Sequence, residues 1–333
     1  VHTDAYYVAR TKELVKLKAD FIAIKDPTGL LTPERGRTLF PAVVKAAGSV
    51  PLKLHSHCQS GLAPEVYEIA IRSGFHYGYT ASRPLANGAS LPATEDIGAR
   101  ARKLGFRTSL DPAALREIAG YFTCVAEREG KPLGEIARYD AALYEHQIPG
   151  GMISNLRSQL QAMGMEHRLP EILEEVPRVR KDLGYPIAVS PFAQYIVTQA
   201  TLNVVQGERY KTIPDEVRKY AMGYYGRLAA QPSDEFLERA AIRPGDLVTE
   251  RPGEHIEPWI PRLRKELGPS VPDEDLLLAA FYPRALLEPL KKRAPQYEFR
   301  TTPLNELIRF IGSRGDIEFA RVRFAGTDMS FTA

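Results

Sequence analysis

Two histidines separated by one residue, His55 and His57, are the residues whose spacing most directly suggests chemistry. They end an apolar stretch that predicts a strand over residues 51–55. Side chains two apart on a strand point to the same face, so two imidazoles could bind one divalent metal ion. The same spacing also fits two surface or hydrogen-bonded histidines.

A lysine closes the preceding apolar strand. Lys25 and Asp26 follow the apolar residues 21–24, and a lysine at a strand end is by default a solvated residue that protects a sheet edge. Because neighbouring parallel strands end at one rim, we expect Lys25 to lie beside the two histidines. A third strand end, residues 79–82, is followed by the flexible turn 87–90.

The first 110 residues alternate between two hydrophobic periods, which predicts βα units and a parallel sheet. Asp4 is expected to cap a helix over residues 4–18, and Thr32, followed by proline, to cap a helix that ends near Gly48. We also expect helices over 63–73 and 92–104 and strands over 75–80 and 106–109.

Beyond residue 110 the hydrophobic period is mostly helical, and prolines and glycines separate the segments. The sequence therefore predicts three regions: βα units over 1–110, a helical domain over 111–245 and a C-terminal region over 246–333. A looser connection is expected over 242–261. The last residues predict a helix and then a hairpin, because apolar residues alternate with polar ones from 317 to 331.

The composition excludes several classes of protein. The 333 residues carry a net charge of +3 with 26% charged residues, an ordinary surface that does not suggest a nucleic-acid partner. Cys58 and Cys124 form no CxxC pair, which favours a reducing compartment. Without a long apolar run or a signal pattern, a cytoplasmic location is expected. The chain begins at Val1 without an initiator methionine.

Several motifs occur in a fixed order along the chain. They are IKDPTGLL (24–31), LHSH (54–57), SGL (60–62), TA (80–81), PLANGAS (84–90), PGG (149–151), SP (190–191), LNVV (202–205), GERYK (207–211) and YGR (225–227). In order and spacing they resemble the carboxyltransferase domain of biotin-dependent pyruvate carboxylase, the oxaloacetate decarboxylase α subunit and transcarboxylase. The resemblance covers roughly residues 1–290.

The resemblance implies roles for particular residues. Lys25 would be carboxylated to a carbamate and would bind a divalent metal together with His55 and His57, with zinc, cobalt and manganese all compatible. The metal would polarise the carbonyl oxygen of a 2-oxo acid. Ser190 matches the threonine whose hydroxyl moves a proton between the methyl group of pyruvate and the ureido nitrogen of biotin. The alternative role of Ser190 is that of a helix N-cap.

Departures from the family pattern lie close to these residues. Cys58 and Gln59 stand where the family has an aspartate, Leu91 replaces a glutamine, and Tyr79 replaces an aspartate at the loop entry. Cys58 is otherwise most simply a small buried residue. These changes could indicate a different acceptor acid.

The family's fourth metal ligand, an aspartate on the first barrel strand, has no counterpart in the sequence, and neither do the arginine and glutamine that hold the substrate carboxylate. The expected fold is thus α/β, the C-terminal half of a TIM-type barrel (about four βα units) followed by a helical funnel domain and a helix-hairpin. A closed barrel needs eight strands, so a second chain or a further segment would have to complete it, and the chain alone would be inactive or nearly so.

Biotin must also come from elsewhere, because no methionine is followed by lysine as in a biotinyl domain. The resemblance implies a biotin carrier domain and biotin carboxylase or decarboxylase subunits as partners, and a homodimer within a larger complex. Two alternatives stay open: a metal-dependent aldolase or acyl synthase of the same superfamily, and a non-catalytic assembly subunit that kept the fold.

Overall fold

The computed structural model describes residues 1–292, 307, 310–311, 314, 319–324 and 327–332. These residues fall into two compact units, Val1–Pro252 and Gly253–Ala333, and the division lies inside the Pro- and Gly-containing stretch 242–261. Among the described residues, no helix combines the length and the apolar character needed to cross a membrane.

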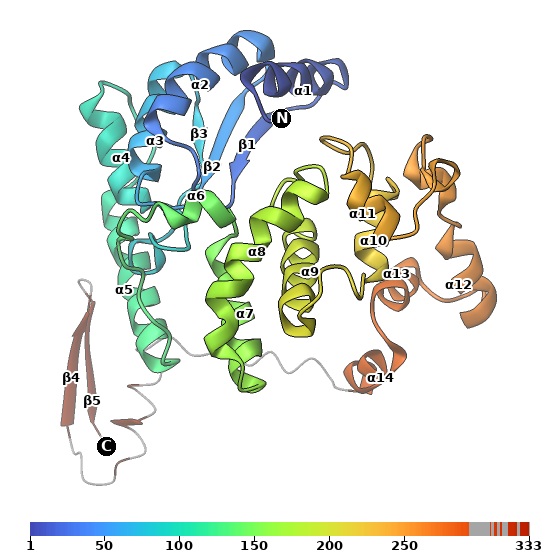
Figure 1. Cartoon of the computed structure of the whole chain (residues 1–333). Coiled ribbons are helices and arrows are strands. Elements are labelled where there is room, and N and C mark those ends of the chain that lie inside the picture. The colour runs from blue at the N-terminus through green and yellow to red at the C-terminus, as the bar shows by residue number, and fades with distance from the viewer. Residues whose placement is uncertain (293–306, 308–309, 312–313, 315–318, 325–326, 333) are drawn as a thin grey trace. The chain divides into compact units, whose positions relative to one another are not determined.

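The first unit opens with alternating helices and strands around a small sheet (Figure 1). The elements are α1 (Asp4–Lys16), β1 (Ile22–Asp26), α2 (Pro33–Ala47), β2 (Leu52–Ser56), α3 (Ala63–Ser73), β3 (Tyr77–Gly78) and α4 (Thr94–Lys103). The three strands are parallel and lie in the order β1-β2-β3, with Ile22 opposite Leu52 and Lys53 opposite Tyr77. This is the βα arrangement that the alternating periods predict.

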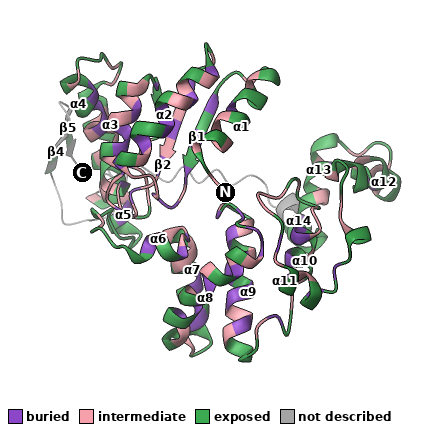
Figure 2. Ribbon diagram, turned by 45° about the horizontal axis from the view of Figure 1, so that its top comes forward, coloured by how far each residue is buried: buried purple, intermediate pink, exposed green. Residues whose placement is uncertain are grey.

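The two faces of this sheet differ in how they are covered. Ile22 and Ile24 of β1 and Leu54 of β2 are buried in one cluster with Phe40 of α2 and Val66 of α3. Among the described residues, no such cluster covers the opposite face: Phe21, Tyr77 and Tyr79 are 50%, 55% and 41% exposed. In Figure 2 buried residues alternate with exposed ones along β1. Parallel sheets are normally covered on both faces, so a parallel sheet with one uncovered face is unusual.

The rest of the first unit is helical and has its own core. Its helices are α5 (Pro112–Arg128), α6 (Ala142–His146), α7 (Gly150–Ala162), α8 (Leu169–Asp182), α9 (Phe192–Gln206), α10 (Asp215–Ala221) and α11 (Asp234–Arg239). Leu160, Ile172, Val176 and Ile196 lie at the centre of this second cluster, each fully buried. The helical period beyond residue 110 is thereby confirmed within the first unit.

The second unit contains α12 (Trp259–Leu267), α13 (Asp273–Phe281), α14 (Arg284–Lys292) and an antiparallel pair, β4 (Phe319–Phe324) and β5 (Thr327–Thr332). The pair confirms the predicted terminal hairpin. The helix expected before it lies largely outside the described residues, although residues 307 and 310–311 are helical.

Several local predictions are confirmed and others are wrong. Thr32 caps α2 through its side chain, which accepts from the Arg35 N–H, and Gly74 ends α3 with a left-handed φ of 108°. Asp4, however, is not the cap of α1: Thr3 accepts from the Tyr6 N–H, so Asp4 lies inside the first turn.

The strand predicted over 106–109 is wrong, because these residues are irregular, and the one predicted over 75–80 shrinks to Tyr77–Gly78. A segment becomes a strand only where a neighbouring strand pairs with it. The two residues of β3 are too few to pair with residues 106–109 as a further strand. Within the part of the chain that the structure describes, the parallel sheet therefore has three strands rather than about four.

Candidate functional site

The ends of β1 and β2 place the predicted site residues side by side. Lys25 and His55 are register partners in the parallel ladder, so their side chains leave the same face of the sheet. That face is the one that α2 and α3 do not cover, since Ile24 and Leu54, one position earlier, point into the core. The predicted juxtaposition of the lysine and the histidine pair is present.

The two histidines meet through their outer ring nitrogens. The Nε2 atoms of His55 and His57 are 3.1 Å apart and the rings are stacked, with centroids 5.1 Å apart. His57 Nδ1 lies 2.6 Å from the carbonyl oxygen of Ala89 and must carry the proton of that hydrogen bond. This leaves Nε2 of His57 with a lone pair, the tautomer that a metal-ligating histidine needs.

The surroundings favour the neutral form of His55. Burial lowers the pKa of this imidazole, and the nearby His57 and Lys25 lower it further, against an opposing contribution from Asp26. The ring of Tyr79 packs against it at a centroid distance of 5.1 Å. A neutral imidazole is the ligand form, so His55 stays ready to bind a cation at a lower pH than an ordinary histidine.

This pair fits part of a metal site. Two nitrogens bound to one tetrahedral Zn²⁺ at about 2.0–2.1 Å would lie roughly 3.3 Å apart, close to the observed separation. Among the described residues no group of three or more His, Cys, Asp and Glu side chains could hold an ion. Cys58 does not add a ligand, because it is buried and burial raises its pKa to about 12.

Asp26 has a structural task instead. Its carboxylate accepts from the backbone N–H groups of Leu30 and Leu31 at 2.8 and 2.9 Å and from the Ser56 hydroxyl at 2.8 Å. The side chain is buried. Asp26 thus folds the loop after β1 back onto the end of β2 and leaves Lys25 at the rim.

Gly29 lies where this loop passes closest to the histidines. Its φ is 73°, and a Cβ there would overlap the backbone carbonyl oxygen of His57. Gly29→Ala is expected to lower the free energy of unfolding by about 2–4 kcal/mol, because the backbone at His57 must move. Denaturant unfolding measures this loss.

Gly48→Ala is the matched control, since Gly48 has a φ of 61° but open space around its Cβ position. It carries the backbone strain without the clash. Equal losses in the two variants would contradict a tight contact between the loop and His57.

The helical part of the unit meets the strand ends at residues 146–150. The Thr28 hydroxyl donates to the Gln147 carbonyl at 3.2 Å, and Gln59 Nε2 donates to the Ile148 carbonyl at 3.2 Å. The Gly150 N–H, at the start of α7, donates to Oε1 of Gln59. The loops after both β1 and β2 are therefore tied to the helical region.

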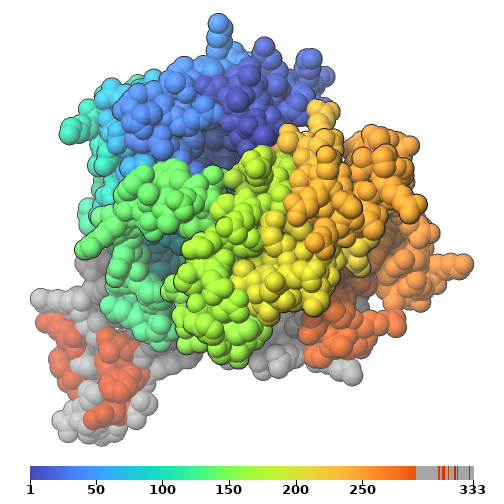
Figure 3. Space-filling view, viewed as in Figure 1, coloured from blue at the N-terminus to red at the C-terminus, as the bar shows by residue number. Residues whose placement is uncertain are grey.

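Ser190 lies just before α9 in an exposed position. Its expected role as the N-cap is wrong, because the residue before the first turn is Pro191 and no side chain caps the helix. Ile187 and Ala188, shortly before Ser190, line a cavity of about 460 Å³ that Lys25 also lines. The blue and green segments that form this cavity adjoin in Figure 3.

Other residues of the site were not predicted. Ala89 contributes only its backbone carbonyl, and the signal that could have revealed it is the Asn-Gly turn at residues 87–88, where Asn87 adopts a φ of 71°. Gln59 appears in the sequence only as a departure from a family pattern. Gln147 and Arg180 carry no local signal, because the contact between them depends on the packing of α8 against α6.

Comparison with known proteins identifies the family. Residues 143–324, more than half of the chain, match the model of the conserved carboxylase domain. A subunit of pyruvate carboxylase from Methanocaldococcus jannaschii is 40% identical over 96% of this chain and 58% of its own length. The methylmalonyl-CoA carboxyltransferase 5S subunit of Propionibacterium freudenreichii is 33% identical over 85% of this chain and 57% of its own length. The chain spans about half the length of the curated relatives it matches.

A solved structure shows the same fold. The carboxyl transferase domain of Rhizobium etli pyruvate carboxylase with pyruvate superposes with a TM-score of 0.75 at 24% identity, over 86% of this chain and 50% of that one. The α/β fold of the chain thus resembles that domain, in agreement with the expectation from the motifs. On the family model and these relatives, the chain belongs to the conserved carboxylase domain family.

Proposed function

We propose that the chain is the carboxyltransferase component of a biotin-dependent enzyme that moves CO₂ between carboxybiotin and a small 2-oxo acid of the pyruvate or oxaloacetate type. One observation carries this proposal. In a member of the carboxylase family, Lys25 lies in register with His55, and His57 faces His55 through an Nε2 atom that carries a lone pair and no proton.

The proposed ligands of the divalent metal are His55, His57 and a carbamate on Lys25. The two imidazoles are close enough to share one ion, and the Lys25 side chain is exposed at the same rim. A divalent ion held there would act as a Lewis acid toward the carbonyl oxygen of the substrate. The Ala89 carbonyl would keep His57 in its ligand tautomer throughout.

The proposed task of Ser190 is proton transfer. Its hydroxyl oxygen would take a proton from the methyl group of pyruvate while its own proton passes to the ureido nitrogen that loses CO₂. A new carbon–carbon bond then replaces the nitrogen–carbon bond of carboxybiotin, so that oxaloacetate and biotin are the products. Ser190 is exposed, and Ile187 and Ala188, shortly before it in the chain, line a cavity that Lys25 also lines.

The uncovered sheet face supports a proposal about assembly. We propose that residues 1–110 form part of a TIM-type barrel, that residues 111–245 form the helical funnel, and that 246–333 form a region that docks a carrier. Further strands, on this polypeptide or another, would cover Phe21, Tyr77 and Tyr79. The proposed setting is a cytoplasmic complex, homodimeric in this component, with a biotin carrier domain and a biotin carboxylase or decarboxylase subunit.

Exchange of label between pyruvate and oxaloacetate in the presence of free biotin tests this function directly. The complete enzyme complex is expected to catalyse the exchange, and Ser190→Ala is expected to slow it roughly 10²–10⁴-fold, because the proton loses its acceptor and donor. Ser190→Thr keeps the hydroxyl and is the matched control, with activity close to that of the unmodified protein.

A complex that catalyses no exchange would refute the carboxyltransferase proposal and favour the aldolase or the assembly subunit. If Ser190→Ala catalyses the exchange at the normal rate and only Ser190→Thr loses activity, Ser190 does not transfer the proton. The metal content of each variant should be unchanged, since Ser190 is not among the proposed ligands.

A further inference from the structure

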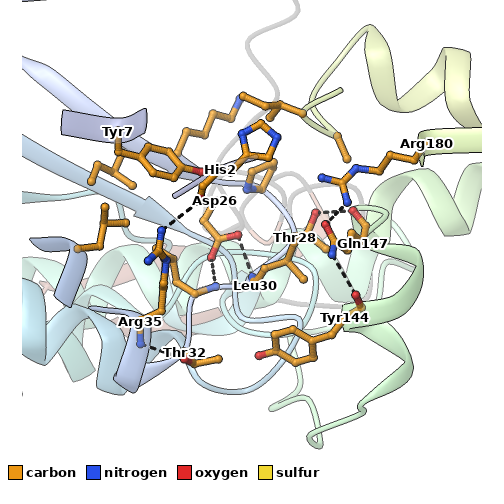
Figure 4. A pocket seen from close by; sticks show the side chains of 17 residues that line it. His2, Tyr7, Asp26, Thr28, Leu30, Thr32, Arg35, Tyr144, Gln147 and Arg180 are labelled. Carbon is orange, nitrogen blue, oxygen red and sulfur yellow. Dashed lines mark hydrogen bonds between the residues drawn. The ribbon is translucent and has the colours of Figure 1, made fainter. Parts of the chain in front are cut away.

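The cavity that Lys25 shares with the turn before α9 also contains a guanidinium group that the proposed reaction does not use. Its lining includes Tyr7 of α1, Lys25 and Asp26 of β1, and Arg180 of α8. Figure 4 shows the Arg180 guanidinium directed toward Gln147, at one side of this space. The cavity is large enough for a small organic acid.

Arg180 is held in place by neutral acceptors. Its Nε donates to the Pro186 carbonyl at 3.0 Å, and one terminal nitrogen donates to Oε1 of Gln147. The Gln147 amide is itself oriented, because its Nε2 donates to the Tyr144 carbonyl at 3.0 Å. The guanidinium is therefore fixed before any ligand arrives, and these two bonds use only part of its five N–H groups.

Among the described residues, no carboxylate pairs with Arg180. The acid in the cavity lining is Asp26, whose oxygens are engaged by the loop after β1 and by Ser56. The second guanidinium in the lining, that of Arg35, already pairs with Asp4. Burial lowers the pKa of Arg180, which reflects a cation drawn out of water without a counter-charge.

We propose that this cavity is a binding site for a small organic carboxylate, held by Arg180 and oriented by its fixed bond to Gln147. A planar guanidinium binds a carboxylate through two parallel N–H···O bonds. The site does not depend on the proposed function, since neither a metal nor biotin takes part in it.

Malonate is the probe. It is added to the complete protein together with the subunits that copurify with it, after a chelator has removed any metal. We expect malonate to bind by calorimetry and to raise the melting temperature, as any ligand of the folded state does. Arg180→Met is expected to bind malonate at least about tenfold more weakly and to lose the temperature shift. Arg157→Met, on the exposed side of α7, is the matched control and should behave as the unmodified protein.

Gln147→Glu provides a second variant that keeps Arg180 intact. The new carboxylate would pair with the guanidinium and compete with the ligand, so malonate binding is expected to fall although the protein is not destabilised. Unchanged malonate affinity in both Arg180→Met and Gln147→Glu would overturn the proposal. Tighter binding of inorganic phosphate than of malonate would overturn the assignment to a carboxylate ligand. A structure of the complete protein in which a carboxylate side chain pairs with Arg180 would overturn it too.

Discussion

Lys25→Ala is expected to abolish carboxyl transfer by the complete complex, with a loss of roughly 10³-fold or more in kcat, because the site loses both a metal ligand and negative charge near the cation. Lys25 is in register with His55, at the position from which a carbamate could reach the ion that the imidazoles bind. Intact-mass analysis of the unmodified protein should show one added carboxyl group, and the metal content should fall in the variant.

Lys53→Ala is the matched control. Lys53 precedes His55 by two residues on the same face of β2, but its ammonium group lies 3.3 Å from the centroid of the Phe21 ring, away from the strand end. The added carboxyl group and the metal should both survive this substitution. An unmodified Lys25 in a metal-loaded, active and fully assembled complex would exclude the carbamate.

The site was predictable where it follows from strand geometry. Lys25 and the histidine pair each lie at the end of an apolar strand, and neighbouring parallel strands end at the same rim of a sheet. Once the βα units are recognised in the sequence, the proximity of these three side chains follows. Thr32 and Gly74 were equally predictable, because the conformation that each imposes is local.

What could not be predicted depends on partners distant in the chain. The extent of β3 depends on a neighbouring strand, and the residues over 106–109 resemble a strand yet have none to pair with among the described residues. The bond between Arg180 and Gln147 exists only because α8 packs against α6, which Gln147 follows. Apolar periodicity indicates which face of a helix is buried, but it does not indicate which polar groups will meet.

Residues 1–333 produced alone are expected to catalyse label exchange at least about a thousandfold more slowly than the complete complex. One face of the sheet exposes Phe21, Tyr77 and Tyr79, and the free edge of β1 has no partner strand among the described residues. Such a sheet is expected to associate with itself, since unpaired edges and apolar surface both favour aggregation. Exchange assays at equal concentrations and sedimentation of the lone chain measure the two consequences.

Tyr77→Ser separates this explanation from general instability. In the lone chain it should reduce self-association, because it removes apolar area from the uncovered face, and in the complete complex it should lower stability, because there the same ring would be buried. Tyr121→Ser, at a ring on α5 that is 42% exposed, is the matched control and should do neither. If the lone chain stays monomeric and exchanges label at the full rate, the three-stranded sheet does not need further strands to cover its exposed face.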